Sequence, residues 1–87
     1  MKLDSTFVRR QFPALAGDWT FLDNAGGAQI LGSVVRRIDD YLLNSNVQHG
    51  ASYAVSRTAG ERVAEATAWM ADFVNAAHPS EVVMGSS

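Results

Sequence analysis

The chain has 87 residues, of which 47% are hydrophobic and 18% charged, and its formal net charge is −2 at pH 7. This composition is typical of one small globular domain, and the charge, without any basic run, argues against nucleic-acid binding as the main activity. The lack of cysteine excludes disulfides and thiolate chemistry, and no apolar stretch suits a membrane span or a signal peptide, so we expect a cytoplasmic protein that does not bind a membrane.

The N-terminal segment contains Lys2, the only lysine of the chain. Chain termini are commonly mobile, whereas an enzyme that attaches its cofactor or substrate to a lysine needs that amine in a desolvated pocket. We therefore expect no catalytic lysine among these residues.

The first predicted helix is capped by Asp4 or Ser5 and extends to about Gln11. Pro13 cannot continue a helix from its interior, so a turn through Gly17 and Asp18 is expected. Residues 19–22 alternate large apolar and smaller side chains, a pattern that predicts a short strand.

Residues 21–29, Phe-Leu-Asp-Asn-Ala-Gly-Gly-Ala-Gln, form the most unusual segment, which we call the glycine loop. Gly26 and Gly27 allow backbone angles closed to other residues and let a ligand approach the main chain. Asp23 and Asn24 can hydrogen-bond neighbouring amides and fix a turn. Two interpretations stay open on this pattern, an ordinary strand-to-helix connection and the lining of a site.

The second predicted helix runs from Gly32 to about Leu43 or Asn44, with apolar side chains on one face and a charged, solvated opposite face. Residues 47–55 have no regular period and are expected to form a loop, either a site loop or a plain surface connection. His49 in this loop has no second histidine or carboxylate nearby, so no metal site is predicted.

The longest predicted helix covers residues 56–77, capped by Ser56 or Thr58, and Thr58 with Glu61 has the spacing of a capping box. Its apolar residues occupy two adjoining faces, which need more partner surface than the rest of the chain supplies. We expect oligomerisation or packing within a larger protein.

The C-terminal residues begin with His78 and Pro79, which end this helix. Residues 81–84 predict a short buried strand, and Gly-Ser-Ser follows at 85–87. Such a sequence starts an anion-binding turn when a helix follows it, because the amides of a helix N-terminus attract phosphate.

Five features, in this order, resemble the N-terminal portion of the class V aminotransferase-like enzymes of fold type I. These are the cysteine desulfurases and their relatives, which use pyridoxal phosphate. The resemblance covers the chain from about Leu3 onward. It rests on Phe-Leu-Asp-Asn-Ala at 21–25, a loop with Asn46, His49 and Ser52, a long alanine-rich helix, Val-Asn-Ala at 74–76, and Glu-Val-Val-Met-Gly-Ser-Ser at 81–87.

The resemblance implies an α/β parent fold, of which this portion is mostly α with two short strands. Residues 1–30 would form a small-domain arm with the glycine loop, and residues 31–87 the start of the large cofactor-binding domain. Ser86 and Ser87 match positions that hold the cofactor phosphate, and His49 lies in a loop that reaches toward the neighbouring subunit's site in a homodimer. The substrate side of the pocket would be approached by the backbone of Ala25, Gly26, Gly27 and Ala28.

The resemblance implies an amino-acid substrate but leaves the reaction open among desulfurase, lyase, epimerase and kynureninase-like chemistries. Gly26 and Gly27 stand where the family more commonly has a pair of small residues that includes alanine or serine. The loop at His49 lacks the Arg-Gly segment of desulfurases. The cofactor-binding lysine has no counterpart, so no catalytic residue is predicted and the chain alone should be inactive. The alternative is a small helical module that dimerises or binds a partner without catalysis.

Overall fold

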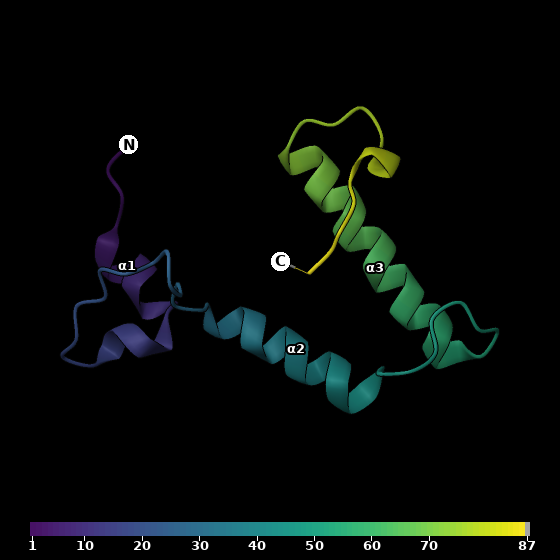
Figure 1. The fold of residues 1–87 in the computed structure, drawn as a ribbon, viewed down its shortest axis with the longest axis horizontal. Coiled ribbons are helices and arrows are strands. Elements are labelled where there is room, and N and C mark those ends of the chain that lie inside the picture. Colours follow the sequence, from purple (N-terminus) through teal and green to yellow (C-terminus); the bar gives the residue numbers. More distant parts are fainter. Residues whose placement is uncertain (87) are drawn as a thin grey trace. The chain divides into compact units, whose positions relative to one another are not determined.

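A computed structural model describes residues 1–86 (Figure 1). The chain divides into two compact units, the first covering Met1–Leu42 and the second beginning at Leu43. Over the described residues the regular structure is entirely helical, with α-helices α1, α2 and α3 and the short 3₁₀ helices η1 and η2. The prediction of a mostly helical chain is therefore confirmed.

The first unit begins with α1, Ser5–Arg10, whose N-cap is Asp4. The Asp4 carboxylate accepts a hydrogen bond from the amide of Phe7 at 3.0 Å, which satisfies one of the free N–H groups of the first turn. At Pro13 the chain forms η1, Pro13–Ala16, with the proline in the first turn, where its missing N–H costs nothing. The predicted turn follows it as a bend at Gly17 and Asp18.

Helix α2, Gly32–Asn44, has the bounds that the sequence predicts. Its first amide, at Gly32, donates to the carbonyl of Gln11 at 2.9 Å, which joins the start of α2 to the end of α1. The N-terminal arm and the glycine loop are thereby closed into one unit.

In the second unit α3, Ala54–Phe73, begins two residues before the predicted start, with Tyr53 as its N-cap. Thr58 and Glu61 thus lie inside the helix, where they cannot form the predicted capping box, and Ser56 has another role described below. Helix η2, Pro79–Glu81, follows and contacts α3.

Helix α3 ends at Phe73 and not at the predicted residue 77 because Asn75 adopts the left-handed conformation, with φ of 57°. The amide of Ala76 donates to the carbonyl of Ala71 at 2.8 Å, and the amide of Asn75 donates to that of Asp72 at 3.1 Å. This is the Schellman pattern, which satisfies the last carbonyls of a helix and stops it.

The two predicted strands, at residues 19–22 and 81–84, are wrong for the part of the chain that the structure describes, which contains no strand. The backbone of Val82 is extended, with φ of −103° and ψ of 123°. An extended segment becomes a strand only when a neighbouring segment satisfies its amides and carbonyls, and residues 1–86 provide none for these two.

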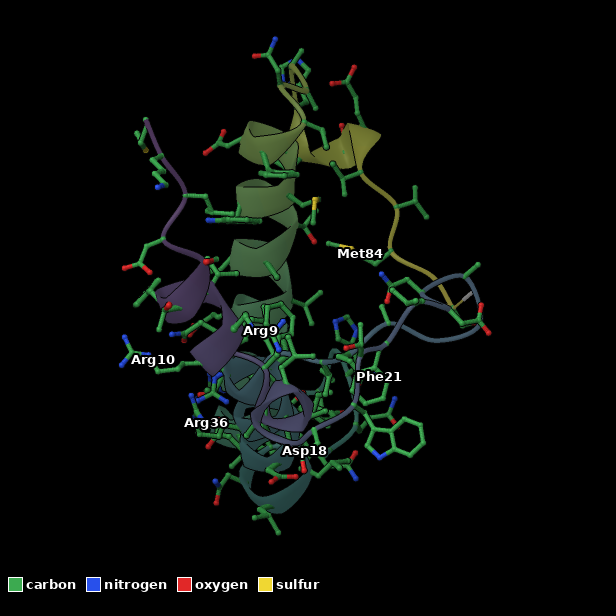
Figure 2. The ribbon with its side chains drawn as sticks, turned by 90° about the vertical axis from the view of Figure 1, so that its left-hand side faces the viewer. Arg9, Arg10, Asp18, Phe21, Arg36 and Met84 are labelled. Atoms are coloured by element: carbon green, nitrogen blue, oxygen red, sulfur yellow. The ribbon has the colours of Figure 1, made fainter. Side chains whose placement is uncertain are left out.

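Burial is confined to small side chains. Among residues 1–86 the buried residues are Ala59, Ala71, Ser45 and Ser56, all in the second unit. Large apolar side chains project from α2 and α3 and are exposed, as is Met84 after η2 (Figure 2). Within the described residues no helix has the length and apolar character needed to cross a membrane.

Candidate functional site

The glycine loop contains a tight turn centred on residues 24–26. The backbone carbonyl of Asp23 accepts hydrogen bonds from the amides of Gly26, at 3.1 Å, and Gly27, at 3.3 Å. The turn is thus held by the main chain of Asp23. The predicted pocket residues that follow are all exposed, namely Ala25, Gly26, Gly27 and Ala28.

Neither Gly26 nor Gly27 has a positive φ, the conformation that a glycine allows. Among the glycines of residues 1–86, Gly50 alone has a positive φ. A Cβ at Gly26 would lie 2.9 Å from Oδ2 of Asp23, so a side chain there requires the carboxylate to move. A Cβ at Gly27 would meet no atom within 4 Å. Gly27 therefore leaves open space beside the main chain, as a ligand-facing position needs.

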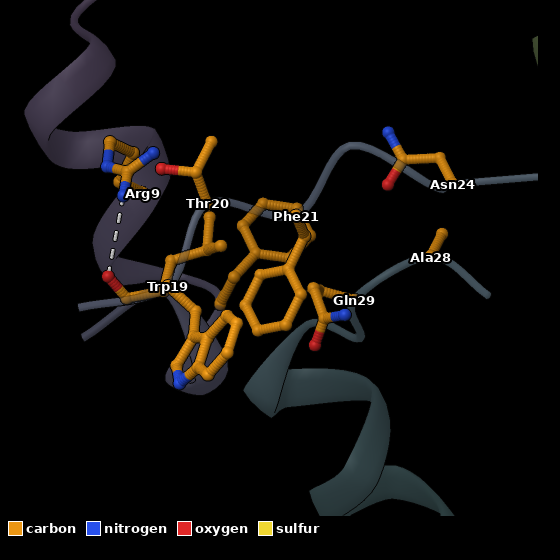
Figure 3. A pocket seen from close by; sticks show the side chains of 9 residues that line it. Arg9, Trp19, Thr20, Phe21, Asn24, Ala28 and Gln29 are labelled. Atoms are coloured by element: carbon orange, nitrogen blue, oxygen red, sulfur yellow. Dashed lines mark hydrogen bonds between the residues drawn. The ribbon is translucent and has the colours of Figure 1, made fainter. Parts of the chain in front are cut away.

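A hollow of about 360 Å³ lies beside the glycine loop in the first unit (Figure 3). Its wall combines aromatic rings with a guanidinium and two carboxamides, from Phe12, Trp19, Phe21, Arg9, Asn24 and Gln29. Ala28 also lines it, and Arg9 donates from Nη2 to the carbonyl of Leu15 at 3.5 Å. Such a wall suits a ligand with an apolar body and an anionic or amide group.

Sequence reasoning did not find Arg9 or Phe12 as wall residues. Arg9 and Phe12 precede the glycine loop by twelve and nine positions, and η1 lies between them and the loop. No local sequence motif predicts such a contact, because it depends on how the chain folds back.

His49 lies in the second unit and is exposed, in the loop that precedes α3. The hydroxyl of Ser56 donates to the carbonyl of Gln48 at 2.6 Å and accepts from the amide of Ala51 at 3.0 Å. The guanidinium of Arg57 donates to the carbonyl of Ser52. The predicted cap residue Ser56 is therefore a loop anchor.

Ser86 is exposed and follows Gly85 at the end of the described residues, whereas Ser87 lies outside them. A Cβ at Gly85 would meet no atom within 4 Å, so the main chain there is accessible. An accessible amide and a serine hydroxyl are the donors that a phosphate group requires, and these residues fit that part of a phosphorylated cofactor. The glycine loop belongs to the first unit, and His49 and Ser86 belong to the second.

Comparison with known proteins gives a consistent result. The sequence profile of the family described as Aminotransferase class-V matches residues 20–87. An aminotransferase-like protein of Gibberella zeae, FGM3, is 44% identical over 84 residues, which is 92% of this chain and 21% of that protein. The chain thus spans about a fifth of the length of this curated relative. No solved structure matches the chain significantly.

Proposed function

The chain belongs to the class-V aminotransferase family, and we propose that it forms the N-terminal portion of a pyridoxal-phosphate enzyme that acts on an amino acid. The observation that carries the proposal is the family match over residues 20–87, which includes the glycine loop, the loop at His49 and the terminal Gly-Ser-Ser. The family generally uses pyridoxal phosphate and has the α/β fold of type I. Within it, the order of motifs favours a cysteine desulfurase-related enzyme.

Each group of residues has a role in this proposal. Ser86 and Ser87 hold the cofactor phosphate, and residues 25–28 border the substrate side of the pocket. His49 extends toward the site of the neighbouring subunit in a homo-oligomer. When bound, pyridoxal phosphate serves as an electron sink for bonds at the substrate carbon next to the amine. The residues of this chain would bind the cofactor phosphate and border the substrate. The lysine that attaches the cofactor covalently would lie elsewhere in the protein.

Purified full-length protein tests the proposal through its cofactor content. We expect saturable binding of one pyridoxal phosphate per chain, measured by the cofactor's absorbance after release. The 87-residue chain should give no specific covalent adduct after borohydride reduction, because its only lysine is Lys2. Full-length protein that binds no pyridoxal phosphate would contradict the proposal, and so would a stoichiometric adduct on the 87-residue chain.

A second candidate function is a helical module that dimerises or binds a partner without catalysis. Trp69 and Phe73 on α3 stack at 5.4 Å between ring centroids, with 9° between their planes, yet they are 64% and 73% exposed. Exposed aromatic pairs of this kind favour an interaction surface. Sedimentation of the 87-residue chain distinguishes the two: a stable, well-folded monomer counts against the module.

Replacement of Gly27 by alanine should separate folding from function. The added methyl meets no atom and needs no positive φ, so the free energy of unfolding should change by less than about 0.5 kcal/mol. If a ligand approaches the main chain here, the same methyl should weaken binding of an amino-acid probe such as L-cysteine by about tenfold.

Gly17→Ala is the matched control, since a Cβ at Gly17 also meets nothing within 4 Å and lies outside the loop. Denaturant unfolding and spectroscopic titration of the holoprotein provide the two measurements. Unchanged affinity in Gly27→Ala would remove the glycine loop from the proposed pocket.

A further inference from the structure

We propose that Ser56 is a positioning residue that holds the loop of residues 48–52 in the shape that presents His49. The inference rests on the proposed function, in which His49 extends toward the site of the neighbouring subunit. It adds the residue that fixes the loop and the means by which it does so.

The first observation is the burial and bonding of the Ser56 side chain. Ser56 is 2% exposed, although it lies in the first turn of a helix whose other early residues are mostly exposed. Its hydroxyl uses both its donor and its acceptor, on Gln48 and Ala51, which lie eight and five positions earlier in the chain. One side chain therefore closes the loop around His49.

The second observation is the state of the loop itself. It contains no helix or strand, so its backbone groups need partners from outside regular structure. Gly50 turns the chain with φ of 77°, and Arg57 donates to the carbonyl of Ser52 from the same helical turn that carries Ser56. The loop is thus tied to α3 at Gln48, Ala51 and Ser52, with His49 exposed between the first two ties.

The consequence for function is a pre-oriented imidazole. A site on a loop loses less conformational freedom on binding when its backbone is already fixed. Ser56 is too buried to contact a ligand itself, so it would act through His49. Loss of the Ser56 hydroxyl should therefore affect ligand binding only while His49 is present.

The first test is hydrogen exchange on full-length Ser56→Ala protein. The amide of Ala51 loses its acceptor, and its exchange should be faster by about tenfold or more. Thr67→Ala is the matched control, because it also removes a hydroxyl of α3 that donates to a backbone carbonyl. The acceptor of Thr67 is Val63, at 2.8 Å within the helix, and not a residue of the loop. Unchanged exchange in Ser56→Ala would overturn the proposal.

The second test is a double-mutant cycle with His49→Gln, read as the apparent affinity of the holoprotein for L-cysteine from the absorbance of its cofactor. Ser56→Ala should weaken the affinity for L-cysteine in protein that retains His49. It should have no further effect in the His49→Gln background. Equal effects in both backgrounds would leave Ser56 with a structural role only and overturn the positioning role. Ser56→Thr, which keeps a hydroxyl, should recover part of the affinity.

The two tests separate the failure of this inference from the failure of the proposed function. Protein without bound cofactor, or without any response to L-cysteine, would overturn the proposed enzyme activity and with it the positioning role of Ser56. Hydrogen exchange at Ala51 would still decide whether Ser56 holds the loop.

Discussion

Replacement of Ala71 by arginine should lower the free energy of unfolding by about 3 kcal/mol, because a long charged side chain would enter a buried position. Ala71 is 3% exposed and lies on α3, the helix that η2 contacts. Its carbonyl also accepts the closing hydrogen bond of the Schellman pattern. Displacement of the backbone at Ala71 should therefore loosen the end of α3 as well.

The matched control is Ala68→Arg, one helical turn earlier on α3 at an exposed position. Both variants place the same residue in the same helix, so helix propensity and net charge change equally. Ala68→Arg should alter stability by no more than about 0.5 kcal/mol. Denaturant unfolding of both variants gives the comparison, and equal losses would mean that burial of Ala71 contributes nothing.

Replacement of Asn75 by valine should cost about 2 kcal/mol, because a β-branched residue is poorly tolerated at φ of 57°. Asparagine enters the left-handed region more readily than other non-glycine residues, which explains its place directly after the helix cap. In Asn75→Val protein the amides of residues 75 and 76 should no longer align for hydrogen bonding with the carbonyls of Asp72 and Ala71. Their hydrogen exchange should accelerate by roughly thirtyfold.

Asn75→Gly is the informative control, since glycine has no penalty in this conformation. It should keep the stability of the parent protein to within about 0.5 kcal/mol. A valine variant as stable as the glycine variant would show that another feature, such as Pro79, ends the helix.

The helices could be predicted because their signals are local. Asp4 is followed by a run that forms α1, and the apolar spacing of residues 32–44 predicts α2 with its observed bounds. The end of α3 could not be read from its alanine-rich composition, which favours helix through residue 77. The helix end is set by the left-handed conformation of Asn75. The preference of asparagine for this conformation is too weak to predict the helix end from sequence.

The strands and the site were harder to predict, because both depend on contacts distant in sequence. Residues 19–22 have a strand pattern, but pairing requires a neighbour that residues 1–86 do not offer. The glycine loop was identified by its composition, whereas the side of the hollow formed by Arg9 and Phe12 was not. Ser56 matched a common cap pattern, and the competing bonds to Gln48 and Ala51 have no signature in sequence.

The placement of the aromatic residues gives each unit its own optical reporter. The chain has two tryptophans, Trp19 at the hollow of the first unit and Trp69 in the stacked pair on α3. Both indoles are exposed, so each should emit as a solvated fluorophore and shift to shorter wavelength when covered. With Trp19→Phe and Trp69→Phe variants, one emission spectrum would report occupation of the hollow and the other the covering of α3.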